Sequence, residues 1–139
     1  MREIDPKKTN RAKAFELWMR SPMPMVTMTK TYDITHLRRV ARRSGVKLNM
    51  LMCYAIGRAA SDFEEFYLLP VGDKLMQFDN LAVNTIVKTK SGGINTCDIP
   101  FSKDVRRFAA DYLRLTAEAM ESSDELNLGD DYMVIGTSA

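Results

Sequence analysis

The sequence predicts a single α/β domain, an α+β sandwich in which a mixed β-sheet is flanked by helices. Segments with the two-residue alternation of β-strands and segments with the 3.6-residue period of helices follow one another along the chain. The 139 residues have the usual size of one domain, which we expect to span residues 1–139. Apolar residues make up 45% and charged residues 27% of the chain, as in an ordinary globular protein.

The first two expected elements are a helix and a strand. Thr9 or Asn10 can cap a helix whose apolar residues repeat at helical spacing until Pro22. Between residues 25 and 33 the side chains alternate, with threonines on one face, and this pattern predicts a strand.

Two helices are expected next. Thr35 can cap a short helix that ends at Gly45, with apolar residues facing inward and a strongly basic outer face. The following helix starts at Asn49 and is apolar on nearly all sides until Arg58, which predicts a central, buried helix. The basic residues of the outer face are Arg38, Arg39, Arg42 and Arg43.

Two pairs of strands follow these helices. Gly72 and Asp73 separate the first pair and suit the positive φ angles of a two-residue hairpin turn. A Ser-Gly-Gly turn separates the second pair, and with it the expected sheet grows to five strands. The expected strands span residues 66–71 and 74–78, then 81–88 and 94–99.

A long helix and a last strand complete the predicted fold. Ser102 can cap the longest helix, whose apolar stripe from Val105 to Met120 should pack on the sheet. Residues 131–139 read as a nearly continuous apolar strand, which is typical of a sheet interior covered on both faces. Natural chains seldom end inside such a strand, so we expect another segment or chain beside it.

Composition narrows the partners and the cellular location. The 20 basic and 18 acidic residues give a net charge of +2, too balanced to require a nucleic acid or a membrane. No apolar stretch approaches the roughly 18 residues of a spanning helix, and no hydrophobic signal region is present, so we expect a cytoplasmic protein. Cys53 and Cys97 are far apart and lack nearby ligand residues, which favours reduced, buried thiols and no metal site.

No recognisable set of residues supports hydrolytic, phosphoryl or metal chemistry. His36 is the sole histidine, and its position beside arginines in a short helix favours a solvated role over that of a general base. The four arginines are the best candidates for contacts with a polyanion. Such residues also commonly form only the solvent-exposed face of an amphipathic helix. No aromatic partners for base stacking lie beside them, so we do not expect nucleic acid binding.

Several motifs in succession resemble the N-terminal region of the chloramphenicol acetyltransferase family. The most specific are Arg11-x-x-x-Phe15 and Asp33-Ile34-Thr35-x-Leu37. Weaker matches follow in the family's order and extend the resemblance over nearly the whole chain. These are Lys47-Leu48, Asp73-Lys74-Leu75, Ile99-Pro100 and Ser102-Lys103-Asp104-Val105.

The resemblance implies a chloramphenicol acetyltransferase-like fold that is incomplete at its C-terminus, and a homotrimer with active sites at subunit interfaces. It implies transfer of an acetyl group from acetyl-CoA to a hydroxyl of a small molecule. The family's general base is a histidine in a C-terminal His-His-x-x-x-Asp-Gly motif, and a serine stabilises the oxyanion. The 139 residues lack this motif, so we expect the isolated chain to be inactive.

The resemblance also assigns individual residues. Ser138 matches the oxyanion serine, and Arg11 matches an arginine that pairs with the aspartate of the missing motif. Each can equally be an ordinary strand or helix residue. Apolar residues replace the usual aromatic walls of the acceptor pocket, which disfavours chloramphenicol as acceptor. The pocket positions are Val26, Met28, Ile94 and Asn95.

A different class of function stays open beside acyl transfer. In this reading the chain is a non-catalytic binding or interaction module. Its arginine face would then hold an anionic partner.

Overall fold

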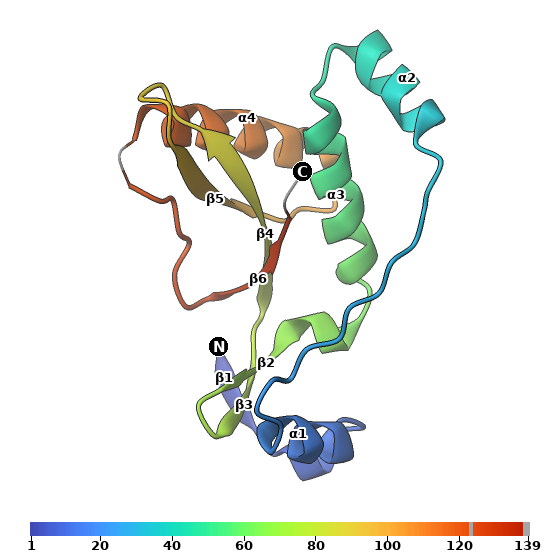
Figure 1. Ribbon diagram of the computed structural model, residues 1–139, viewed down its shortest axis with the longest axis vertical. Coiled ribbons are helices and arrows are strands. Elements are labelled where there is room, and N and C mark those ends of the chain that lie inside the picture. The colour runs from blue at the N-terminus through green and yellow to red at the C-terminus, as the bar shows by residue number, and fades with distance from the viewer. Residues whose placement is uncertain (123, 138–139) are drawn as a thin grey trace.

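Two three-stranded sheets and four α-helices make up the computed structural model, which describes residues 1–122 and 124–137 (Figure 1). The expected fold class, mixed β-structure with flanking helices, is confirmed. The strands do not form the single five-stranded sheet that we expected. The chain runs from β3 straight into β4 (Figure 1), so these strands lie end to end and belong to different sheets.

The first sheet is small and antiparallel. β1 (Arg2–Ile4), β3 (Lys74–Gln77) and β2 (Leu68–Val71) pair in that order. Gly72 has a φ of 62° at the hairpin turn, as expected, but Asp73 keeps a negative φ. β1 was not expected, because three residues are too few to show an alternating pattern.

Short helices surround this first sheet. The 3₁₀-helix η1 (Pro6–Lys8) follows β1, and α1 (Ala12–Met19) forms where the sequence predicted the first helix. A second 3₁₀-helix, η2 (Glu64–Tyr67), takes up the start of the predicted strand 66–71.

The second sheet is mixed and lies over the main core. β4 (Asn80–Lys88) is central, pairing antiparallel with β5 (Ile94–Pro100) and parallel with β6 (Tyr132–Gly136). α3 (Leu48–Ala60) and α4 (Val105–Glu121) pack on one face, where Phe108 is fully buried. The residues that β4 contributes to that face are Val83, Thr85 and Val87, all buried as their shared side of the strand predicted.

α2 (Thr35–Ser44) ends at Gly45, whose φ of 67° permits the left-handed conformation expected there. Ile34 and not Thr35 occupies the N-cap position of α2 and makes no side-chain capping bond. The carboxylate of Asp33, one residue earlier, accepts a hydrogen bond from the Thr35 backbone nitrogen at 2.8 Å. α4 shows the same difference, since Asp104 and not Ser102 caps its first turn. A carboxylate is at least as good an N-cap acceptor as a hydroxyl.

α3 is not buried on all sides as expected. Met50, Cys53, Gly57 and Ala60 are buried, but Ala55 is exposed. The sheet and α4 cover one side of the helix, and only part of α2 contacts it elsewhere.

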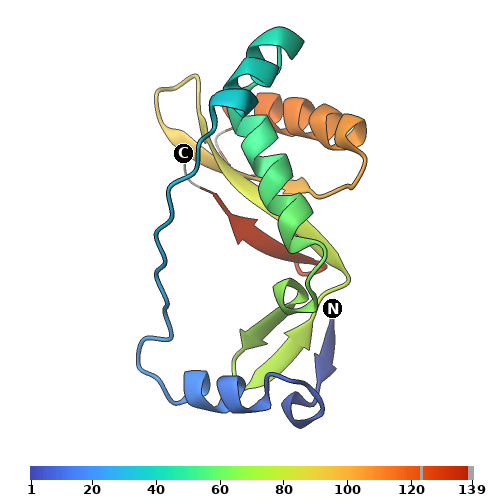
Figure 2. The same ribbon diagram turned by 90° about the vertical axis from the view of Figure 1, so that its right-hand side faces the viewer.

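Residues 25–33 do not form the predicted strand. The segment runs in an extended path along the outside of the molecule from α1 to α2 (Figure 2). A strand needs a neighbour that takes up its backbone hydrogen bonds, and none of the named strands of the described chain pairs with it. Its side chains are therefore exposed, with Met28 90% accessible.

β6 confirms the expected last strand, although Tyr132–Ile135 are only half buried. The predicted strand reached Ala139, and its last two positions lie outside the described residues. No described helix is long and apolar enough to cross a membrane.

Candidate functional site

The four predicted pocket residues lie in two separate places. Val26 and Met28 are exposed on the extended segment before α2. Ile94, which is 70% exposed, and Asn95 begin β5 at the tip of the β4–β5 hairpin. Figure 1 shows the segment and the hairpin on opposite sides of the molecule. A single chain therefore does not bring the two pairs together.

Asn95 is buried and anchors a loop. Its amide nitrogen donates to the carbonyl oxygens of Ala119 at 3.1 Å, Ser122 at 2.9 Å and Asp124 at 3.2 Å. These bonds tie the end of α4 and the following loop to β5. The side-chain donor is thus engaged within the protein.

Ser138 lies outside the described residues, but the residue before it is well anchored. The Thr137 hydroxyl donates to the Asn84 carbonyl oxygen at 2.7 Å, and the Thr137 backbone nitrogen donates to the same oxygen at 2.9 Å. The sulfur of Cys53 lies 3.7 Å from the Thr137 hydroxyl oxygen. The chain just beyond β6 is thereby held against β4 and α3.

A polar network continues from this point into the core. The Asn49 amide nitrogen donates to the hydroxyl oxygens of Thr85 at 2.9 Å and Tyr112 at 3.2 Å. Burial raises the pKa of the Tyr112 hydroxyl, and the hydrogen bond from Asn49 opposes this shift. A neutral Tyr112 hydroxyl therefore accepts from Asn49 over the physiological pH range. One sign of this network is visible in the sequence, where an asparagine stands at the start of an otherwise apolar helix.

A second buried polar pair joins β4 to β5. The Asn84 amide donates to one carboxylate oxygen of Asp98 at 2.7 Å, and the Leu128 backbone nitrogen donates to the other at 3.2 Å. Both cysteines are free and buried, as expected. Burial, with the nearby charges of Asp98 and Glu118, raises the pKa of the Cys97 thiol to about 11, which makes it a poor nucleophile at neutral pH.

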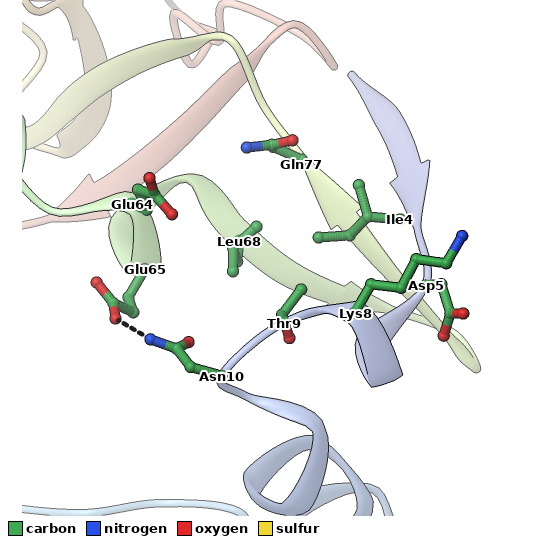
Figure 3. Close-up of a pocket in the computed structure, with 9 residues that line it drawn as sticks. All are labelled: Ile4, Asp5, Lys8, Thr9, Asn10, Glu64, Glu65, Leu68 and Gln77. Atoms are coloured by element: carbon green, nitrogen blue, oxygen red, sulfur yellow. Dashed lines mark hydrogen bonds between the residues drawn. The ribbon is translucent and has the colours of Figure 1, made fainter.

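A cleft of about 550 Å³ lies between the N-terminal segment and the first hairpin (Figure 3). Asn10 and Glu65 face each other across one end, with an amide-to-carboxylate distance of 3.5 Å. Asp5 caps η1 by accepting from the Lys7 backbone nitrogen at 2.9 Å. The lining residues are Ile4, Asp5, Lys8, Thr9, Asn10, Glu64, Glu65, Leu68 and Gln77.

An apolar groove of about 270 Å³ adjoins this cleft and shares Glu65 and Leu68 with it. Arg11 lies at the groove beside Phe15 and Trp18 of α1. Arg11 is exposed, so its guanidinium is accessible to a further partner.

These sites hold no complete acyl-transfer centre within the described residues. His36, the sole histidine of the sequence, is exposed on the first turn of α2. It lines neither the cleft nor the groove. In the described part of the chain, no group of three or more potential ligand residues could hold a metal ion.

The arginine face of α2 has the form expected from the sequence. Arg38, Arg39, Arg42 and Arg43 are exposed, while Ala41 is buried. A hollow of about 260 Å³ is lined by Thr35, Arg38, Arg39 and Arg42.

Comparison with known proteins gives a consistent family match. Residues 1–135 match the family model described as chloramphenicol acetyltransferase. The chain is 29% identical over 116 residues to chloramphenicol acetyltransferase 2 of Escherichia coli, covering 83% of this chain and 54% of the relative. It is 25% identical over 112 residues to chloramphenicol acetyltransferase 3 of Escherichia coli, covering 80% of this chain and 53% of the relative.

The fold comparison agrees with the sequence match. A solved structure of a chloramphenicol acetyltransferase aligns with a TM-score of 0.80 at 22% identity, over 99% of this chain and 68% of that one. This likeness shows the fold. The chain spans about half the length of the curated relatives it matches.

Proposed function

The chain belongs to the chloramphenicol acetyltransferase family, and from this membership we propose that it contributes to acetyl transfer from acetyl-CoA to a hydroxyl of a small acceptor. In this proposal the 139 residues supply the scaffold and part of the acceptor pocket. The observation that carries it is the family match over residues 1–135, which includes all four α-helices and both sheets except Gly136, the last residue of β6.

The reaction requires a base that removes the proton of the acceptor hydroxyl as its oxygen attacks the thioester carbonyl carbon. The resulting oxyanion needs a hydrogen-bond donor before the bond to sulfur breaks and the CoA thiol leaves. Ser138 is our proposed donor, because it matches the family's oxyanion serine in the resemblance. It follows Thr137, which is bonded to Asn84 of β4 and lies beside Cys53 of α3. We propose that the base lies outside these 139 residues, because they lack the family's C-terminal histidine motif and their sole histidine, His36, is exposed on α2.

Arg11 is proposed as a structural partner of the site. Its exposed guanidinium beside the apolar groove is suited to pair with a carboxylate outside these 139 residues. Such a pair would join α1 to the segment that carries the base.

The acceptor pocket is proposed to form between copies of the chain in a homotrimer. Within one chain, the segment that carries Val26 and Met28 and the hairpin that carries Ile94 and Asn95 lie on opposite sides of the view in Figure 1. A pocket between subunits lets the exposed segment of one copy face the hairpin of another. Because all the exposed side chains at these positions are aliphatic, the proposed acceptor is not chloramphenicol itself.

An assay of free CoA thiol tests the claim that this chain lacks a general base. The assay measures thiol release from acetyl-CoA in the presence of a panel of hydroxylated acceptors. We expect no turnover by the isolated chain, because no base is available. The chain without acceptor is the matched control, since Cys53 and Cys97 could contribute a slow background of thiol. Clear turnover by this chain alone would contradict our assignment.

Complementation tests the acyl-transfer proposal itself. Coexpression with the C-terminal half of chloramphenicol acetyltransferase 2 of Escherichia coli adds the kind of segment that the relative has beyond the matched region. If the two parts copurify, we expect turnover with at least one acceptor. A copurified pair that transfers no acetyl group to any acceptor would argue against the proposal.

A further inference from the structure

We propose that the outer face of α2 binds a small ligand that carries closely spaced phosphate groups. The ligand would lie over the hollow formed by Thr35, Arg38, Arg39 and Arg42. This inference does not rest on acyl transfer, because it requires neither a base, nor an acyl donor, nor a second copy of the chain.

The arginines are concentrated on a short, regular element. Arg38 pairs by helical spacing with Arg42, and Arg39 with Arg43, so that each pair lies on one side of successive turns. The four positions span roughly 7.5 Å along the helix axis at 1.5 Å per residue. All four side chains are exposed. Several positive charges are therefore available within the reach of one small anion.

These charges are not neutralised within the described chain. The ion pairs found among residues 1–122 and 124–137 all involve other groups. The sequence contains no acidic residue between Asp33 and Asp62. Asp33 accepts from the Thr35 backbone nitrogen, and Asp62 pairs with Arg58 and Lys103. Like charges at this spacing destabilise a helix, and a bound phosphate group would relieve their repulsion.

The inner face of α2 holds the arginines in place. Ala41 is buried, and the half-buried Val46 packs against the core beyond the helix. The left-handed Gly45 and the hydrogen bond from the Val46 backbone nitrogen to the Ala41 carbonyl oxygen fix the end of the helix. Figures 1 and 2 show α2 at one extremity of the molecule, away from both sheets. A ligand therefore meets an ordered and accessible cationic surface.

The chemistry of the hollow favours phosphate over other anions. All of its cations are arginines, whose planar guanidinium donates two parallel hydrogen bonds to phosphate oxygens. Thr35 also lines the hollow. Its side chain and backbone nitrogen hydrogen-bond the Asp33 carboxylate and lower the pKa of that carboxyl group. A volume of about 260 Å³ suits a small molecule. α2 carries no Phe, Tyr or Trp for base stacking, and its one aromatic ring is the exposed imidazole of His36. We therefore place recognition in the phosphates.

Titration calorimetry with inorganic tripolyphosphate tests the site on the full 139-residue chain. We expect binding that weakens as salt rises from about 50 to 500 mM, because exposed charges are screened. Arg38→Gln/Arg42→Gln should weaken it at least about tenfold, since charge-assisted hydrogen bonds are lost. Glutamine keeps a helix propensity close to that of arginine, and circular dichroism checks that the variant folds.

Arg106→Gln/Arg107→Gln is the matched control, because it removes two exposed charges from α4. We expect this control to bind like the parent chain. Three outcomes would overturn the proposal: no tripolyphosphate binding by the parent, equal weakening in both variants, or binding that is as tight for orthophosphate as for tripolyphosphate. Binding of a single-stranded oligonucleotide or of anionic vesicles without binding of tripolyphosphate would also overturn it, and would assign the face to a polymer or a lipid surface.

Discussion

Asn95 illustrates how one buried side chain can hold a loop in place. The strand pattern identifies it only as a residue of a strand, and the family resemblance assigns it to an acceptor pocket. In the structure its amide nitrogen serves three carbonyl oxygens from α4 and the following loop.

We predict that Asn95→Ala lowers the free energy of unfolding by about 1–3 kcal/mol, because the change leaves the buried Ala119 carbonyl group without its side-chain donor and removes the bonds to Ser122 and Asp124. Urea denaturation measures the effect. Ile94→Ala is the neighbouring control, and because Ile94 is 70% exposed its effect should stay within about 0.5 kcal/mol. Unchanged stability in Asn95→Ala would show that these bonds contribute little.

At the scale of elements, α3 approaches β4 and the residue that directly follows β5 through a glycine. A Cβ atom added at Gly57 would lie 2.4 Å from a ring carbon of Phe101 and 3.0 Å from a methyl group of Val83. The Phe101 ring is itself confined, because it packs against Tyr54 and Phe108 with both centroid separations at 5.9 Å. The close approach of helix and sheet therefore depends on the missing side chain.

We predict that Gly57→Ala destabilises the fold by about 1–3 kcal/mol through overpacking. The sign of this change in stability is informative. At an open helix position, alanine would instead stabilise the fold by about 0.5–1 kcal/mol relative to glycine. Thermal or urea unfolding distinguishes the two. Phe101→Leu in the same chain removes the ring and should recover part of the loss, whereas a stabilised Gly57→Ala single variant would contradict the packing argument.

The helix caps and the hairpins show which features of the elements can be predicted. The hairpin turn at Gly72 and the end of α2 at Gly45 follow from a local requirement for positive φ, and both were predicted. The caps were assigned to Thr35 and Ser102, but Asp33 and Asp104 are the acceptors. In each helix the predicted cap and the observed acceptor lie two residues apart. Which of the two accepts the hydrogen bond depends on local geometry that residue preferences alone do not resolve.

For the whole molecule, the main open surface is the segment between α1 and α2. Met28 is 90% and Val26 68% exposed, and apolar side chains at this density are typical of a protein interaction site. We propose that the segment is covered when the chain assembles with further copies.

We predict that Val26→Asp/Met28→Asp shifts the chain toward monomer, because charges would be buried at the proposed interface without partners. Sedimentation velocity over a range of concentrations measures the shift. The melting temperature of the monomer should not change, since these side chains are exposed within one chain. Leu113→Asp, at an exposed position on α4, is the control, and the same dissociation in both variants would argue against a role for the segment.

The sequence by itself determined the features that depend on near neighbours in the chain. These are the four α-helices, the two hairpins, the arginine face of α2 and, through a succession of short motifs, the family. Helical periodicity and turn chemistry act within a few residues, so they can be read from the letters.

Only the tertiary structure decided which distant segments meet. Residues 25–33 alternate like a strand but find no partner within the described chain, whereas the three residues of β1 pair with β3 despite showing no pattern. The division into two sheets, the role of Asn95 and the cleft beside Glu65 likewise depend on contacts between residues far apart in sequence. A strand is stabilised by the neighbour that takes its hydrogen bonds, and a local sequence pattern does not specify that neighbour.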